Sequence, residues 1–362
     1  MQKRGLIGLS TAAVVCVVAA AALATGGPET NTVGLDARAL PALAAELGEV
    51  GTVELKRQDL DVTFRRKGED WLVEQKGGYP ADAGKVRQVV LALADMTLVE
   101  PKTREPKLYP RLEVEDPGKG KSALVSLSGQ KGEKIGALII GKRSYDRLGA
   151  GNDGVYVREP GKAQSWLARG GLDLSGDLVG WLDRQVIDIK QGRIAKVTLT
   201  QTNGTSLVLS RKTADGKFAV EGAAADTKYK NDTATGEPAQ ALETLDLTDV
   251  VPAAKMPLPK KGVATASYTT FDGLTVELKL FEDNKKDWVA VAATGTGKAA
   301  AEAKKIEARV SPWRYQIPQF KAQMLQTKLA DLLAPPPPPP SPPAPASPPA
   351  PPSPPAPAPK TP

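Results

Sequence analysis

The sequence predicts an α+β fold of repeated antiparallel β-meander plus helix modules, with an N-terminal membrane segment and a disordered proline-rich tail. Three observations lead to it. Short runs of alternating apolar and polar residues recur in the same order, an uncharged apolar run opens the chain, and 18 of its 32 prolines lie in the last 28 residues. Alternation with period two is typical of strands that bury one face. The roughly 300 residues between the two ends are long enough to divide into modules.

Residues 1–27 are typical of a signal peptide or a membrane anchor. Lys3 and Arg4 precede the uncharged run 6–24, which as a helix would span about 28 Å, close to a bilayer core. The run ends in Ala22-Leu23-Ala24, which suits signal-peptidase cleavage. Two alternatives stay open, an uncleaved anchor in the cytoplasmic (inner) membrane and a cleaved signal peptide with release to the periplasm. Both place the bulk of the chain outside the cytoplasm.

After a linker and short helix at residues 28–49, a first module is expected at residues 50–193. Its opening meander has strand patterns at 52–57, 61–66 and 71–74. A helix follows, with Asp82 as its candidate N-cap. Its apolar stripe has helical spacing and comprises Val86, Val89, Val90, Leu93 and Met96. Extra short strands are expected at 122–127, 134–140, 154–158 and 164–167.

The same order returns twice, which suggests duplication of one α+β module. A second repeat module is expected at residues 194–256, with strands at 194–200, 206–211 and 217–221 and a helix marked by Ala239, Leu242 and Leu245. A third meander and C-terminal helix are expected at residues 257–334, with strands at 264–270, 274–281 and 287–293 and a helix near 298–308. The last amphipathic helix is marked by Phe320, Met324, Leu325, Leu329, Leu332 and Leu333. The tail, residues 335–362, is expected to be an extended polyproline II spacer.

The composition excludes much of the usual chemistry of enzymes. The chain has no histidine, and its one cysteine, Cys16, lies in the apolar run. It therefore has no Ser-His-Asp triad, no Cys-His pair, no HExxH zinc helix and no internal disulfide. We nominate no catalytic, cofactor-binding or metal-binding residue and expect no cofactor. A hydrolase that uses two carboxylates is the one enzymatic alternative that remains.

Several motif look-alikes favour structure over chemistry. The segment 136–142 fits GxxxxGK, but Arg143 stands where Ser or Thr is required and the run is β-like. Ser128 opens an SxxK pattern inside a polar loop between strands. Asn203-Gly204 starts a glycosylation sequon, yet this dipeptide is first of all a hairpin turn. The glycine-rich segment 149–154 is more typical of a turn than of a calcium loop.

Charge and aromatic content argue against nucleic-acid binding. The formal net charge is +7, but Lys3, Arg4 and Lys360 lie in the two ends, and without them 45 basic side chains face 41 acidic ones. Aromatic residues make up 5% of the chain, too few for a base-stacking platform. The tryptophans are expected to anchor the core, with a glycan-binding groove as the alternative. They are Trp71, Trp166, Trp181, Trp288 and Trp313.

Five pieces of sequence, in order, resemble a known bacterial family, the domain of unknown function 4340. They are the meander that ends in Trp71, Tyr79-Pro80-Ala81-Asp82 at the start of a helix, Leu112-Glu113-Val114-Glu115-Asp116-Pro117, the strand closed by Ile139-Ile140-Gly141, and Trp181-Leu182-Asp183. The resemblance covers about residues 50–255 and extends less clearly to 333. It implies an N-terminal membrane segment and, because some members are encoded beside gliding-type ABC export components, an accessory role in the envelope. The family has no established catalytic residues to carry over.

The N-terminal segment 1–27, the repeated β-rich modules and the family resemblance lead to one expected function. We expect a non-catalytic envelope protein with an extracytoplasmic domain, an accessory or scaffold of an ABC-type, gliding-like transport system. Its partners would be the membrane, through residues 6–24, and an envelope protein such as a transporter component. A cell-wall polysaccharide-binding module is the alternative, suggested by the proline spacer and the tryptophans, and a carboxylate-dependent hydrolase is the second alternative.

Overall fold

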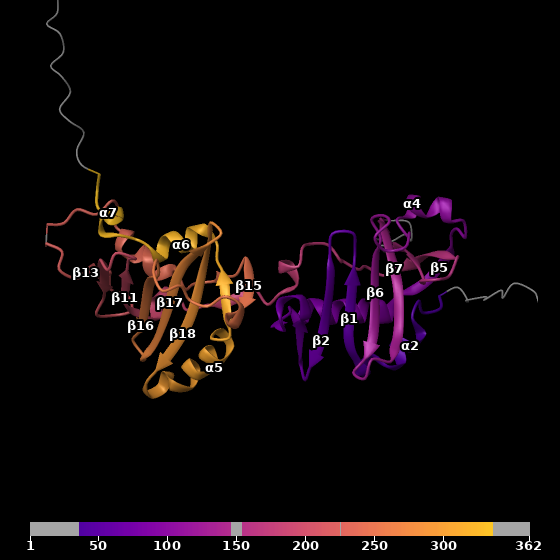
Figure 1. Ribbon diagram of the computed structural model, residues 1–362, viewed down its shortest axis with the longest axis horizontal. Coiled ribbons are helices and arrows are strands. Elements are labelled where there is room, and N and C mark those ends of the chain that lie inside the picture. Colours follow the sequence, from indigo (N-terminus) through magenta and orange to yellow (C-terminus); the bar gives the residue numbers. More distant parts are fainter. Residues whose placement is uncertain (1–35, 146–153, 225, 336–362) are drawn as a thin grey trace, which may run out of the picture.

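The computed structural model describes residues 36–145, 154–224 and 226–335 as two lobes arranged along one long axis (Figure 1). The N-terminal lobe is built on a nine-stranded sheet and the C-terminal lobe on an eight-stranded sheet, and a two-stranded sheet lies in the segment that joins them. Every strand pair is antiparallel. The predicted mixed α+β class with antiparallel sheets and few helices is confirmed.

The N-terminal sheet has the strand order β4-β3-β2-β1-β6-β7-β8-β9-β5. Its strands are β1 (Val50–Lys56), β2 (Asp61–Lys67), β3 (Asp70–Val73), β4 (Tyr79–Pro80), β5 (Thr97–Pro101), β6 (Ala123–Gly129), β7 (Lys134–Ser144), β8 (Gly154–Arg158) and β9 (Ser165–Arg169). Its helices are α2 (Pro41–Ala45), α3 (Ala83–Asp95) and α4 (Tyr109–Leu112), with 3-10 turns η1 (Leu47–Glu49), η2 (Glu74–Lys76) and η3 (Pro106–Leu108).

Helix α3 covers one face of this sheet, and its start and its apolar stripe are as predicted. The Asp82 carboxylate accepts a hydrogen bond from the Lys85 backbone N–H at 3.1 Å, which confirms the N-cap. The five stripe residues from Val86 to Met96 are all buried. Val86 and Val89 enclose a small apolar space of about 10 Å³ together with side chains from β1, β2 and β6. The stripe is therefore core packing, as its spacing indicated.

The C-terminal sheet has the order β13-β12-β11-β16-β17-β18-β19-β15. Its strands are β11 (Ile194–Thr200), β12 (Ser206–Ser210), β13 (Ala219–Val220), β15 (Asp249–Pro252), β16 (Ala264–Thr270), β17 (Leu274–Asp283), β18 (Lys286–Gly295) and β19 (Trp313–Gln316). Its helical elements are α5 (Ala300–Val310), α6 (Gln319–Leu325), α7 (Leu329–Leu332), η6 (Ala234–Gln240), η7 (Ala253–Lys255) and η8 (Gly297–Ala299). The joining segment carries β10 (Gln185–Ile187), η4 (Val179–Trp181) and η5 (Gln191–Arg193), and β10 pairs with β14 (Leu245–Asp246).

The two large sheets share one strand order. Apart from the extra β4, each N-terminal strand has a counterpart in the C-terminal sheet whose label is higher by ten, from β3 and β13 at one edge to β5 and β15 at the other. The irregularity in register also recurs, since β1 shifts against β6 at Val50/Thr52 and β11 shifts against β16 at Ile194/Lys196. β-bulges are specific features of a strand pair. Their matching positions support duplication of the whole eight-strand unit.

The structure therefore has two large units where the sequence suggested three. The strands expected at 264–293 do not form a sheet of their own, because β16 pairs directly with β11 and completes the C-terminal sheet. The helix expected through Ala239, Leu242 and Leu245 is a 3-10 helix that ends at Gln240, and Leu245 belongs to β14. The long final helix is two short ones, α6 and α7, and Phe320 on α6 is 60% exposed.

A buried lysine closes the end of η6. The Lys321 side chain on α6 points its ammonium at three carbonyls, and Nζ donates to Gln240 O and Ala241 O at 3.2 Å and to Glu243 O at 2.6 Å. Lys321 is 7% exposed, and burial lowers the pKa of its ammonium. It thereby satisfies carbonyls that a 3-10 helix cannot satisfy internally.

We expect Lys321→Met to lower the free energy of unfolding by about 2–3 kcal/mol, because methionine fills the space but removes the side-chain donor of the Ala241 and Glu243 carbonyls, while Gln240 O keeps the Glu243 backbone N–H at 3.1 Å. Urea unfolding at pH 7 measures it. The control is Lys305→Met on the exposed side of α5, which should change the same free energy by less than about 0.5 kcal/mol. Equal effects of the two substitutions would contradict the capping role.

The two lobes meet at one edge of each sheet, through a cluster that we call the joint: Lys76, Tyr79, Asp183, Asp249, Trp313 and Tyr315. The Tyr79 ring packs edge-on against Trp313, with ring centroids 4.9 Å apart, and lies 6.2 Å from the ring of Tyr315. Its hydroxyl donates to the Asp183 carbonyl at 3.0 Å, and Lys76 pairs with Asp249. One continuous apolar core extends through both lobes. The joint thus resembles packed interior rather than a flexible linker.

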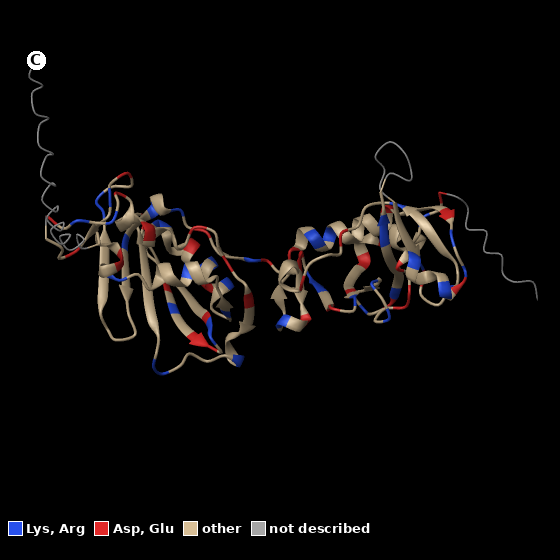
Figure 2. Ribbon diagram, turned by 90° about the horizontal axis from the view of Figure 1, so that it is seen from above, with Lys and Arg blue, Asp and Glu red and all other residues tan. Residues whose placement is uncertain are grey.

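The described chain begins and ends at opposite ends of the molecule (Figure 1). The predicted membrane segment, residues 6–24, and the proline-rich tail after Pro335 lie outside the described residues. Within the ranges given above, no helix has the length and apolarity needed to cross a bilayer. Basic and acidic side chains are interspersed on both lobes (Figure 2).

Candidate functional site

The N-terminal lobe has a cavity of about 460 Å³ at its outer end, which we call the Trp166 pocket. Its floor consists of four side chains on the face of the sheet that α3 covers elsewhere: Leu98, Leu138, Val157 and Trp166. Val157 pairs with both Ile140 and Trp166 across the sheet, so the floor continues the core beyond the reach of α3. The three aliphatic side chains are buried, and Trp166 is half-buried.

One wall of the pocket is the segment that precedes α2. Residues 36–39 run antiparallel to β5 at the sheet edge, where Asp36 N donates to Leu98 O and Leu98 N donates to Ala37 O, both at 2.8 Å. Ala39 N donates to Met96 O at 2.8 Å. Arg38 pairs with Asp95 at 3.2 Å. These contacts cover the outermost edge strand of the sheet and fix the wall against the floor.

The rim opposite this wall is polar and comes from two loops. Arg104 Nε donates to Gln164 Oε1 at 2.6 Å, and Glu159 and Lys162 lie on the turn between β8 and β9. Both loops are held by Ser165, which is fully buried: its hydroxyl donates to Thr103 O at 2.8 Å and accepts from Thr103 N at 3.0 Å. The rim is therefore fixed by buried hydrogen bonds before any ligand arrives.

Beneath the rim lies a buried guanidinium. Arg158 is 4% exposed and donates to Val114 O at 2.8 Å, to Asp116 Oδ1 at 2.6 Å and to Lys162 O at 3.1 Å. Its Cζ lies 4.5 Å from the centroid of the Tyr109 ring. The hydrogen bond from Arg158 lowers the pKa of the Asp116 carboxyl. Arg158 thus links the Glu-Asp-Pro segment of the sequence to the turn that carries Lys162.

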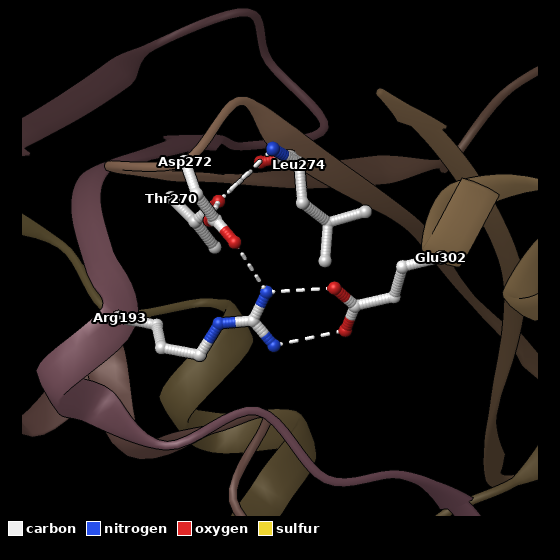
Figure 3. Close-up of polar contacts among 5 residues, drawn as sticks. All are labelled: Arg193, Thr270, Asp272, Leu274 and Glu302. Atoms are coloured by element: carbon white, nitrogen blue, oxygen red, sulfur yellow. Dashed lines mark hydrogen bonds and ion pairs between the residues drawn. The ribbon is translucent and has the colours of Figure 1, made fainter. Parts of the chain in front are cut away.

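A second polar cluster lies in the C-terminal lobe, at the start of β11 (Figure 3). Arg193 donates two hydrogen bonds of 2.8 Å to the Glu302 carboxylate on α5 and a third of 2.8 Å to Asp272 in the β16–β17 turn. The buried Thr270 hydroxyl also donates to Asp272 and accepts from Leu274 N at 2.9 Å. Both terminal nitrogens of Arg193 and both oxygens of Glu302 have partners within the cluster, so it fastens a strand, a turn and a helix together.

This cluster should make the C-terminal lobe sensitive to acid. Hydrogen bonds from Thr270 and then Arg193 lower the pKa of Asp272, and the bond from Arg193 lowers the pKa of Glu302. A carboxyl whose pKa is lower in the folded than in the unfolded protein stabilises the fold at pH values above its unfolded pKa. This stability is lost as the pH falls through the pKa of the folded protein.

We therefore expect Arg193→Met to flatten the loss of unfolding free energy between about pH 5 and pH 3. Both carboxylates are about two-fifths exposed, so solvent screening limits the effect to about 1 kcal/mol. Urea unfolding of both proteins across this range measures it, and an unchanged slope in the variant would count against the ion-pair explanation.

A third hollow, of about 650 Å³, opens beside the joint and is lined by several acids. Asp82 caps α3, and Asp246 pairs with Arg184 at 3.9 Å. Burial raises the pKa of Asp183. Across the described ranges, no three His, Cys, Asp or Glu side chains lie close enough to hold a metal ion. Of the acids around this hollow, Asp82 and Asp246 therefore have structural partners.

The look-alike motifs occupy structural positions. Segment 136–142 lies within β7 and Ser128 within β6. Asn203-Gly204 makes the turn between β11 and β12, with Gly204 at φ +85°. Of the glycine-rich segment 149–154, residues 149–153 lie outside the described residues, and Gly154 begins β8.

Sequence reasoning nominated no site residue and missed the rim of the Trp166 pocket. Of the five tryptophans, Trp71, Trp181 and Trp288 are buried, while Trp166 and Trp313 are half-buried. Arg104 and Lys162 lie in irregular loops, where a single basic residue carries no recognisable spacing. Partial exposure distinguishes Trp166 from the three buried tryptophans, and that is a property of the folded chain.

The chain matches one family model, described as Domain of unknown function (DUF4340), over residues 71–266. The match covers most of the N-terminal sheet, the joining segment and the C-terminal sheet up to β16. No match was found among curated proteins or among solved structures. Because the matched residues make up more than half of the chain, the protein belongs to the DUF4340 family.

Proposed function

We propose that this protein is a non-catalytic envelope protein, held at the membrane by residues 6–24, whose extracytoplasmic lobes serve as an accessory arm or scaffold of an ABC-type transport system. The observation that carries the proposal is the path of the chain. It enters along β5 at the outer edge of the first sheet and leaves beside the outer edge of the second, near β13 (Figure 1). An arm of this kind would place the last described residues, near β13, away from the point of attachment.

The contacts at the far end and in the middle support a stiff arm. At the far end, Lys230 N donates to Leu332 O and Ala334 N donates to Lys228 O, both at 2.9 Å. In the middle, Arg309 on α5 donates to the carbonyls of Gln185 and Val186 in the joining segment. A stiff body transmits position between its ends, which suits a scaffold. Three of the five tryptophans are used as core, which weakens the support for the glycan-binding alternative.

Affinity purification tests the proposal. The full chain with a small C-terminal tag is extracted from native membranes in mild detergent, and the bait control carries residues 1–35 fused to an unrelated soluble domain. We expect transporter subunits to be enriched with the full chain and not with the control. Repeated recovery of no membrane partner, or equal recovery by the control, would refute the proposal.

A further inference from the structure

We propose that the Trp166 pocket binds a single-chain anionic amphiphile, with its aliphatic chain on the floor of the pocket and its acidic head group between Arg104 and Lys162. This inference goes beyond the scaffold function, because it assigns a small-molecule ligand to the N-terminal lobe. The cavity of about 460 Å³ falls within the usual range of small-molecule sites.

The floor selects the aliphatic part of the ligand. Leu98, Leu138 and Val157 offer no polar side-chain atom, and the backbone of β8 is paired on both sides, with β7 and β9. A sugar hydroxyl or a peptide amide placed on this floor would lose water and gain no partner. A hydrocarbon chain loses nothing there and buries its own apolar surface.

The rim selects the head group. Arg38 already pairs with Asp95, but within the described residues neither Arg104 nor Lys162 has a carboxylate within 4.0 Å. Glu159 is the one acid that lines the pocket, so cationic side chains outnumber acids at its mouth. Charge-assisted hydrogen bonds to a carboxylate or a phosphate are stronger than neutral ones. The charge at the rim therefore complements an anionic head group.

The rim is also preorganised. Ser165 and Thr103 hold the Arg104 loop, and the Arg158 guanidinium holds Lys162 O, so both cations extend from fixed backbone. Preorganised groups bind with a smaller loss of conformational entropy. The wall that faces them, residues 37–41, lies in the linker that follows the predicted membrane segment, residues 1–27, so a membrane-held chain would keep the pocket near a source of amphiphiles.

The test uses fluorescence quenching by a brominated probe. The full chain is held in nanodiscs of phosphatidylcholine and titrated with 11-bromoundecanoate, whose bromine quenches a tryptophan that it touches, and the same titration on Trp166→Phe is subtracted. We expect saturable quenching that the Trp166→Phe protein lacks. Quenching that never saturates, or that is equal in both proteins, overturns the proposal.

Competition by unbrominated carboxylates of eight to twelve carbons adds a second readout. After correction for partition into protein-free nanodiscs, each added methylene should strengthen binding about fourfold, as expected for buried hydrocarbon. Affinity that does not change with chain length, or displacement of the probe by soluble cell-wall fragments at lower concentration than by decanoate, overturns the assignment of the ligand.

Variants at the rim separate charge from fold. The double variant Arg104→Gln, Lys162→Gln should weaken binding of the bromo acid about tenfold or more. The control Lys212→Gln, on an exposed loop of the other lobe, should leave binding unchanged.

Ala163→Trp should block the mouth of the pocket, and the loss of binding should appear without a change in thermal stability, because Ala163 is exposed. Binding of 11-bromoundecanol as tightly as the acid would overturn the role of the head group. The scaffold proposal has its own test in the purification experiment, so either proposal can fail alone.

Discussion

Replacing Arg158 with methionine is expected to lower the free energy of unfolding by about 3–5 kcal/mol. The guanidinium is 4% exposed and supplies donors to Val114 O, Lys162 O and the Asp116 carboxylate, and it stacks on Tyr109. Methionine fills part of the space but leaves the Val114 carbonyl buried without a donor, which carries most of the penalty. Urea unfolding at pH 7 measures the change.

Two further substitutions distinguish this buried site from an ordinary surface ion pair. Arg158→Lys keeps the charge but not the planar fork, so an intermediate loss is expected. Arg169→Met removes a half-exposed cation 3.7 Å from Asp36 and should cost less than about 1 kcal/mol. A loss at Arg158 no larger than that at Arg169 would show that the guanidinium is hydrated in solution.

The Arg158→Met protein should also bind the bromo acid less tightly than wild type, because the turn that carries Lys162 loses its anchor. A loss of stability without a loss of binding would show that contacts other than the Arg158 hydrogen bond position the Lys162 turn. Arg158 is thus a positioning residue for the proposed head-group contact. The Glu-Asp-Pro segment is one of the pieces of sequence that carry the family resemblance. Its hydrogen bonds with Arg158 give this segment a structural role in the fold.

Local signals in the sequence predicted local structure well. The Asp82 cap, the apolar stripe on α3 and the Asn203-Gly204 turn each depend on residues only a few positions apart, and each is present. The same holds for the alternating strands, whose buried positions follow the predicted period of two, as in β6 and β16. The α+β class follows from these pieces.

Longer-range features could not be predicted in this way. No local pattern says that β16 pairs with β11 across more than sixty residues, so a continuous sheet was interpreted as two units. Gly236 and Pro238 disfavour an α-helix at η6 and favour the tighter 3-10 form. At the C-terminus, the Asp331 side chain accepts from Lys328 N at 2.8 Å and starts a new helix, which breaks the predicted long one.

The Trp166 pocket was beyond prediction for the same reason. Its wall, floor and rim come from segments near residues 38, 98, 104, 138 and 160, which no short motif unites. The apolar floor residues obey the strand pattern and are indistinguishable in sequence from residues that α3 covers. What distinguishes them is that the segment around residues 37–41 and the loops with Arg104 and Lys162, rather than α3, border the cavity above them.

The joint gives the second large effect. Tyr79→Ala is expected to lower the free energy of unfolding by about 3–5 kcal/mol, because it removes a 4% exposed ring from the packing between Trp313 and Tyr315. It also removes the hydroxyl that donates to Asp183 O. We expect calorimetry to show one transition for the wild type and two for the variant, since each lobe keeps its own sheet while the core between them is interrupted.

Tyr79→Phe is the matched control for this prediction. It keeps the ring and loses only the hydrogen bond to Asp183 O, so the cost should be about 1 kcal/mol and the single transition should persist. Small-angle scattering on the same proteins should show a fixed distance between the lobes in wild type and Tyr79→Phe and a broader distribution in Tyr79→Ala. A single transition and an unchanged scattering profile in Tyr79→Ala would mean that Lys76, Asp249 and Arg309 suffice to hold the lobes. A broadened profile with loss of the co-purified partner would tie the stiffness of the joint to the scaffold function.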